Sequence, residues 1–147
     1  MKTSKLIILL AAFSIIAFAS YRLGAKKMAS AGNLIKNNIQ FSGKILSYSR
    51  SHNHSYGIVK IKVIESNRRE FTGSDSLGVF PYRIQGDYAE FYGYIPKAIS
   101  IGDLIVLNSD EQTFTYYKSG KIEAETMIFI TAENENIQYV RANTAFK

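Results

Sequence analysis

The stretch ISIGDLIVLNSDEQTFTYYKSGK, residues 99–121, decides the fold of this chain. Gly102 and Asp103 form a turn signal directly before an apolar run, and a second run, rich in β-branched and aromatic residues, follows it. Ser119 and Gly120 can then close a tight hairpin into a third run. This succession of short runs and turns predicts an antiparallel meander. Its expected strands are residues 104–108, 113–117 and 122–130.

The chain before and after the meander adds further short strands. Residues 56–64 have the cleanest alternation, because Val59, Ile61 and Val63 share one face of an extended chain. The other expected strands are residues 39–48, 79–84, 88–95 and 137–140. Strands of this length and number predict an all-β fold, a small antiparallel barrel of the OB-like or SH3-like kind behind an N-terminal hydrophobic helix. A β-sandwich is the alternative.

Composition restricts the chemistry that the chain can perform. Its 147 residues suit one domain, and the absence of cysteine excludes disulfides, thiolate metal sites and a cysteine nucleophile. The net charge of +6 is uneven, because residues 1–50 hold eight Lys and Arg and no Asp or Glu. The β-domain is therefore close to neutral, which argues against nucleic acid as a partner.

The first 25 residues predict a membrane anchor or signal segment. Lys2 and Lys5 precede an apolar run at residues 6–19 that only Ser14 interrupts. Extension of the run to residue 25 gives enough length for one span of the cell membrane, with the β-domain outside the cytoplasm. The alternative is a secreted or periplasmic protein, because Ala17 and Ala19 fit a signal-peptidase site with cleavage after Ala19.

Residues 26–38 follow as a basic, polar linker, and residues 39–147 form the expected β-domain. The lysines of the linker suit contact with anionic lipid headgroups. The linker also fits a solvated stalk or a continuation of the anchor helix, and these two interpretations are preferred.

Two separate blocks of the chain carry a resemblance to a known group of proteins. One is the opening strand FSGKI at residues 41–45, and the other is the block at residues 99–120, with its Ile-x-Ile-Gly-Asp turn, aromatic strand and Ser-Gly pair. Together with the N-terminal apolar segment, they make the chain similar to small uncharacterised bacterial cell-envelope proteins. That group has no known activity, so the resemblance implies an architecture and a location only.

No residue pattern in the chain matches an enzyme or a cofactor site. His52 and His54 are two apart and could share a face, but they lie in a polar loop without an assignable third metal ligand. The chain contains no glycine-rich phosphate loop, nucleophile elbow or catalytic triad signature. We therefore expect no enzymatic activity, no metal and no cofactor.

Aromatic and arginine residues are dense between residues 65 and 95, where the alternating pattern fails. On an OB-like sheet, exposed rings beside arginines could stack on a planar or anionic partner such as a glycan or a lipid headgroup. The competing interpretation is that the rings fill the core. We expect a structural or interaction role in the cell envelope, with an envelope protein or glycan as partner. A binding module for a glycan, lipid headgroup or other anionic ligand is the alternative. The candidate ligand-binding residues are Arg68, Arg69, Tyr82, Arg83, Tyr88, Tyr92 and Tyr94.

Overall fold

The computed structural model describes residues 2–146, with side chains described at residues 8–26 and 29–146. The chain divides into two compact units, Met1–Ala31 and Gly32–Lys147. The described part of the first unit is helical, and the strands lie in the second unit.

Helix α1 (Lys2–Ile35) supplies the described part of the first unit and runs through most of the predicted linker. Its part from Ile8 to Ile35 is long and apolar enough to cross a membrane, a property shared by anchor helices and signal sequences. Ser14 donates its hydroxyl to the carbonyl of Leu10 at 2.9 Å, so this polar side chain is satisfied within the helix. The N-terminal apolar helix predicted from the sequence is therefore present.

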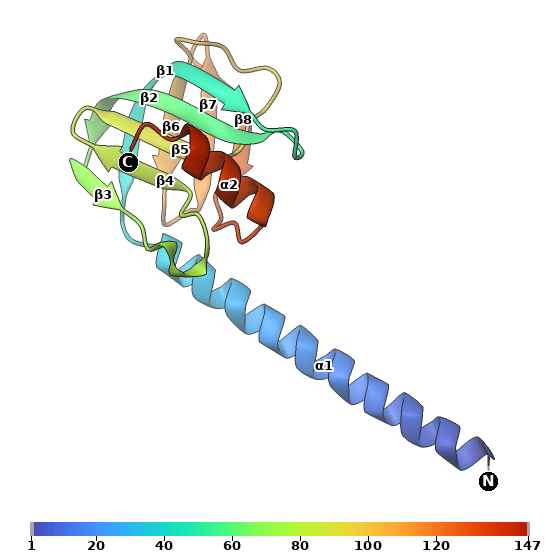
Figure 1. Ribbon diagram of the computed structural model, residues 1–147. Coiled ribbons are helices and arrows are strands. Elements are labelled where there is room, and N and C mark those ends of the chain that lie inside the picture. Colours follow the sequence, from blue (N-terminus) through green and yellow to red (C-terminus); the bar gives the residue numbers. More distant parts are fainter. Residues whose placement is uncertain (1, 147) are drawn as a thin grey trace. The chain divides into compact units, whose positions relative to one another are not determined.

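The second unit is built on one antiparallel sheet of eight strands (Figure 1). Their order across the sheet is β3-β4-β5-β2-β1-β6-β7-β8. The strands are β1 (Gln40–Arg50), β2 (Tyr56–Ser66), β3 (Glu70–Thr72), β4 (Tyr82–Gln85), β5 (Tyr88–Tyr94), β6 (Leu104–Asn108), β7 (Thr113–Lys118) and β8 (Lys121–Met127). The meander predicted from residues 99–121 is therefore present as β6, β7 and the start of β8.

The fold is mostly β but not purely so. The strand predicted at residues 137–140 is wrong, because these residues lie in helix α2 (Asn134–Asn143). Four apolar-rich residues are too few to separate a strand from a helix by periodicity. Asn136 and Val140, four apart, are the buried residues of α2, and this is helical spacing.

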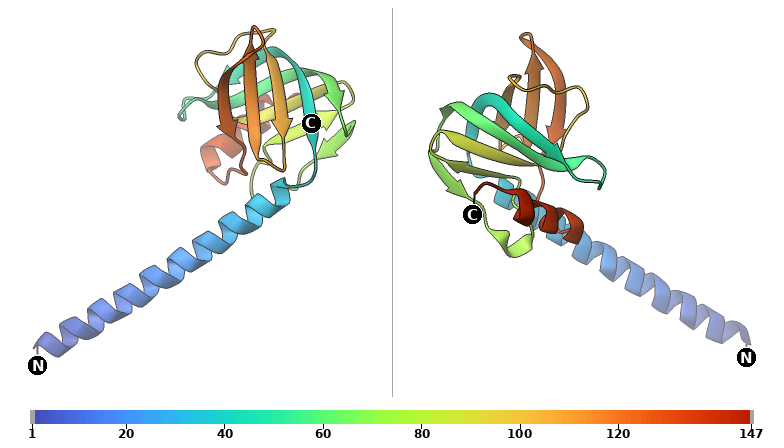
Figure 2. Two further views of the ribbon diagram at one scale, coloured as in Figure 1. Left: turned by 180° about the vertical axis from the view of Figure 1, so that it is seen from behind. Right: turned by 45° about the horizontal axis from the view of Figure 1, so that its top comes forward.

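The sheet curls around one main core but is not closed. Phe91 of β5 stacks on Phe114 of β7 with ring centroids 4.0 Å apart, so the two halves of the sheet face each other across the core (Figure 2). Strands β3 and β8 are the two edges. Between the edge regions a single antiparallel bridge joins Val79 to Thr131, outside the named strands. The barrel predicted from the sequence is therefore not confirmed, because the edge strands β3 and β8 do not pair with each other.

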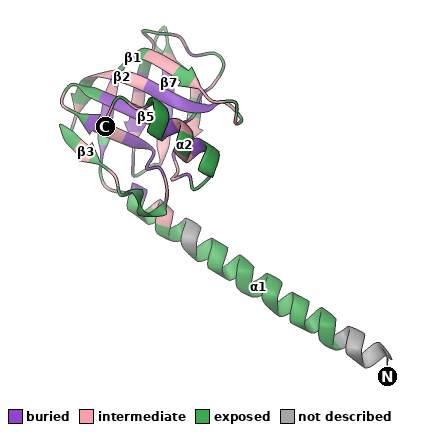
Figure 3. Cartoon of the chain, viewed as in Figure 1, coloured by how far each residue is buried: buried purple, intermediate pink, exposed green. Residues whose placement is uncertain are grey.

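A smaller second core lies on the outer face of β2 and β5. Helix α2 covers this face (Figure 1), and Val140 of the helix packs with Ile58 and Tyr92 of the strands. Strands β2 and β5 are therefore buried on both faces over much of their length (Figure 3).

The start of the second unit is bound firmly to the sheet. Ile35 and Ile39 are buried in the main core. The amide of Asn38 donates to Asp110 Oδ1 at 2.9 Å, and the amide of Ile39 donates to Ser109 Oγ at 2.8 Å. Within the predicted linker, Ile35 and Asn38 therefore contact the β-domain.

Candidate functional site

A row of charged side chains crosses the outer face of the sheet. Arg83 of β4 lies opposite Glu90 of β5, and Glu90 lies opposite Lys60 of β2. Cross-strand partners point to the same side of a sheet, so the three side chains share the outer face. One negative group is thereby set between two positive ones.

Glu90 is a buried carboxylate, with 1% of its surface exposed. It accepts hydrogen bonds from the Tyr92 hydroxyl at 2.8 Å, the Thr144 hydroxyl at 2.6 Å and the Ala145 amide at 3.0 Å. A buried charge is tolerated when donors of this kind replace its water. These donors fix the carboxylate and the chain that follows α2 in one arrangement.

Arg83 holds the same piece of chain from the other side. Its Nη1 donates to the carbonyl of Phe146 at 3.1 Å, and its Nη2 lies 3.1 Å from Asp75 Oδ2. We call Thr144–Phe146 the docked segment. Glu90 and Arg83, which are cross-strand neighbours on β5 and β4, therefore both bind this short piece of backbone.

Two cavities border the docked segment. One, of about 440 Å³, lies between α2 and the turn at Asp75–Leu77, and Arg83 and Arg141 both line it. The other, of about 370 Å³, is mostly apolar and is lined by Lys60, Tyr88 and Glu90. Phe146 borders both cavities. The outer face is thus a groove that the docked segment fills only in part.

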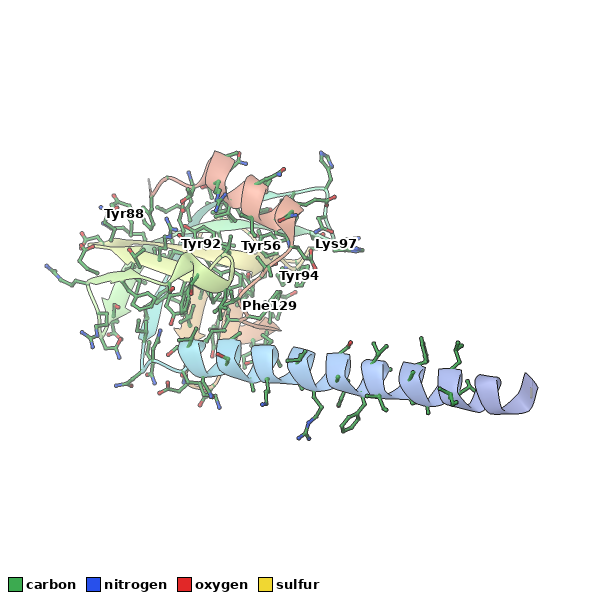
Figure 4. The ribbon with its side chains drawn as sticks, turned by 60° about the horizontal axis from the view of Figure 1, so that its bottom comes forward. Tyr56, Tyr88, Tyr92, Tyr94, Lys97 and Phe129 are labelled. Atoms are coloured by element: carbon green, nitrogen blue, oxygen red, sulfur yellow. The ribbon has the colours of Figure 1, made fainter. Side chains whose placement is uncertain are left out.

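The structure divides the seven residues predicted as a ligand surface into separate groups. Tyr82 lies in the main core and Tyr92 lies beneath α2, so neither ring is open to a ligand. Arg83 and Tyr88 border the groove. Arg68 and Arg69 are exposed next to β3, away from the groove. Tyr94 packs edge-on against Tyr56 and lies 5.6 Å from Phe129 by ring centroids (Figure 4).

The phenols beneath α2 are held in their protonated form. Burial raises the pKa of Tyr92 and of Tyr56 above the ordinary value, and it raises the pKa of Tyr82 in the main core to about 12. The protonated Tyr92 hydroxyl is the form that can donate to Glu90. The Tyr92 ring therefore helps to position the Glu90 carboxylate.

A second polar network fixes the loop between β1 and β2 to the start of α2. The side-chain amide of Asn53 donates to Glu133 Oε2 at 2.8 Å and to Asn136 Oδ1 at 3.1 Å. Asn136 is fully buried and also donates to Thr131 Oγ1 at 3.3 Å. His52 and His54 of the same loop are exposed. Over the part of the chain that the structure describes, no cluster of three or more His, Cys, Asp or Glu is arranged to hold a metal ion.

Sequence reasoning missed Glu90 and the docked segment. Glu90 is the one charged residue of β5, between Tyr88 and Tyr92. This position signals a carboxylate among aromatic rings, but its donors at residues 144 and 145 are too far away in the sequence to be anticipated.

Comparison of the chain with protein-family models, curated proteins and solved structures finds no match in any of the three.

Proposed function

We propose that the chain is a membrane-anchored interaction module of the cell envelope, with the β-domain outside the cytoplasm and without enzymatic activity. The apolar helix from Ile8 to Ile35 and the basic residues at its start support the anchor. The resemblance to bacterial envelope proteins supports the location. The near-neutral charge of the β-domain favours a protein partner over nucleic acid.

The finer architecture that we propose is a partly open OB-like barrel. The strand order β5-β2-β1-β6-β7 supports this architecture. In this order β1 pairs on one side with β2, the next strand in the sequence, and on the other side with β6, a strand from the second half of the domain. The bridge between Val79 and Thr131 supports an approach of the two edges. OB-like domains bind partners on the face of their second and third strands, which here corresponds to β2 and β5.

One observation carries the interaction role. Arg83 and Glu90, on the outer face of the sheet, hold a piece of backbone and leave cavities on either side of it. The Glu90 carboxylate already accepts hydrogen bonds from three donors. It is therefore suited to binding a segment of chain and not to acting as a general base.

The interaction role can be tested with a photo-crosslinking residue at Tyr88, which borders the groove. The matched control is the same residue at Ile122 of β8, an exposed position on the other half of the sheet. We expect discrete adducts in cells from position 88 and none from position 122. Equal adduct patterns, or none from position 88, would contradict the proposal.

The orientation can be tested separately, because the chain has no cysteine of its own. A single cysteine introduced by Glu111→Cys lies in an exposed loop of the β-domain. We expect a membrane-impermeant maleimide to label it in intact cells or spheroplasts. Labelling only after lysis would put the β-domain in the cytoplasm.

A second candidate function is the binding of a small anionic amphiphile in the cavity beside α2. Two guanidinium groups, Arg83 and Arg141, line this cavity together with apolar side chains such as Leu77 and Val140. Octyl phosphate and octyl glucoside share one apolar chain and differ in charge. We expect the phosphate alone to shift amide resonances of residues around the cavity, and Arg141→Gln to abolish the shifts. Equal shifts with both compounds would exclude charge recognition.

A further inference from the structure

Two of the four hydrogen bonds between the sheet and the docked segment are made to its backbone. Glu90 Oε1 accepts the amide of Ala145, and Arg83 Nη1 donates to the carbonyl of Phe146. Every polypeptide carries a carbonyl at each residue, and every residue other than proline also carries an amide hydrogen. The other two are made to the Thr144 hydroxyl, which lies 2.6 Å from Glu90 Oε2 and 3.0 Å from the Tyr92 hydroxyl. The outer face of the sheet thus contacts groups that most polypeptides carry, together with a hydroxyl side chain at one position.

The docked segment is not enclosed as a core segment would be. Ala145 is exposed, and Phe146 is only half-buried. The two cavities beside Phe146, of about 440 and 370 Å³, leave space next to its ring. The groove could therefore hold a longer chain or a larger side chain than the docked segment provides.

The groove suits one class of occupant. Thr144 is extended, with φ −63° and ψ 140°, so the bound backbone has left the helical conformation. Arg83 and Glu90 carry opposite charges and together suit an uncharged backbone, in which one residue donates its amide hydrogen and the next residue accepts at its carbonyl. The partner chemistry that fits is a non-helical polypeptide segment with Ser or Thr two positions before an aromatic residue.

We propose that the groove over Arg83 and Glu90 is a binding site for a short non-helical segment of a partner protein, and that Thr144–Phe146 occupies the site when the partner is absent. This inference rests on the proposed interaction role and names its partner. The docked segment competes with the partner from within the same chain, which lowers the apparent affinity for any external peptide.

The test uses the full chain in detergent micelles and the labelled peptide acetyl-Asn-Thr-Ala-Phe-Lys. The variant Ala145→Pro removes the amide hydrogen that Glu90 accepts, and the extended conformation of Thr144 is one that a residue before proline adopts. Ala145→Ser keeps the amide hydrogen and is the matched control. We expect the proline variant to bind the peptide at least tenfold more tightly than the wild type and the serine variant.

A control on the ligand side leaves the protein unchanged. The same peptide with an N-methyl group on its alanine nitrogen offers no hydrogen to Glu90, and we expect its binding to the proline variant to be at least tenfold weaker. Equal affinity of the two peptides would overturn the proposal, as would a folded proline variant that does not bind.

A measurement on the wild type covers the case in which the proline variant does not fold. Hydrogen exchange of the Ala145 amide should be at least tenfold faster than that of core amides such as Phe91, because a displaceable segment opens without unfolding of the sheet. Equal protection of the two amides would overturn the proposal. If adducts form at position 88 while the peptide tests fail, the interaction role stands and only its peptide partner is excluded.

Discussion

The two halves of the sheet differ in what covers their outer faces. The half that contains β2 and β5 is covered on the inside by the main core and on the outside by α2. The outer face of β8 is open, and Ile122 and Met127 are 62% and 72% exposed. Alternation in the sequence is readable where one face meets water and is lost where both faces are covered. The loss of alternation in β5 and at the start of β2 therefore marks double coverage, whereas residues 67–77 lack a pattern because most of them are exposed.

The largest expected effect, at alkaline pH, falls mainly on the doubly covered half. Burial raises the pKa of Tyr82 to about 12 and raises the pKa of Tyr56, Tyr92 and Tyr116 as well. A folded-state pKa above the unfolded value of about 10 gives stability that is complete below that pH and lost as the pH rises through the folded value.

We therefore expect the β-domain to unfold above about pH 10, with the phenolate absorbance of these four rings appearing together with the loss of the circular dichroism signal. Tyr82→Phe should make the unfolding less steep in pH. Appearance of all the phenolate absorbance while the domain remains folded would contradict this prediction.

The next largest effect removes the contact that joins the halves. Phe91→Ala and Phe114→Ala each delete a fully buried ring from the stacked pair, and each should lower the free energy of unfolding by about 3–5 kcal/mol. Denaturant titration of both single variants and the double variant measures the coupling. A coupling of about 0.5–1.5 kcal/mol is expected for the stacked pair, and strict additivity would show that the halves are held together elsewhere.

A pair of tyrosine variants compares the halves directly. The Tyr92 hydroxyl donates to Glu90, whereas among the described residues the Tyr116 hydroxyl of β7 makes no hydrogen bond. Tyr92→Phe should therefore lower the free energy of unfolding by roughly 1–3 kcal/mol, because it takes a donor from a buried carboxylate. Tyr116→Phe should be neutral or stabilising. Thermal melts of the two variants check this, and equal destabilisation would remove the distinction.

The smallest effect concerns an exposed ion pair on the first half. Lys62 lies 3.2 Å from Asp87 and 4.4 Å from the centroid of the Tyr88 ring. Lys62→Met should cause almost no loss of stability, because water screens both partners. A larger loss in a urea titration would show that Lys62 has a structural role that its exposure does not suggest.

The sequence predicts the regular strands well because local patterns determine them. Residues 104–108 are predicted and observed as one strand, since a turn precedes an apolar run there. Strand β3, at Glu70–Thr72, is missed because three residues establish no period. Strict alternation along residues 122–130 would place Ile122 on the same face as Ala124, but Ile122 is exposed. A register shift between Tyr116 and Tyr117 turns Ile122 outward.

The candidate site is less predictable because its parts are distant in the sequence. Arg83 and Tyr88 could be named from composition alone. The burial of Tyr92 depends on α2, more than forty residues later, and the sequence pattern does not predict that helix. A local pattern does not contain contacts of this range, so it cannot say which of two aromatic faces will be covered.

The hydrogen bonds at the start of the β-domain have a mechanical consequence. The amides of Asn38, Ile39 and Gln40 donate to side chains in the loops that follow β6 and β2, and Gln40 begins β1. Strand β1 pairs with β2 along one edge and with β6 along the other. A pulling force applied at residue 40 therefore acts on the middle of the sheet, where two ladders share the load. We expect such a force to shear many backbone hydrogen bonds at once, so the domain resists tension better at this point than it would at an edge strand.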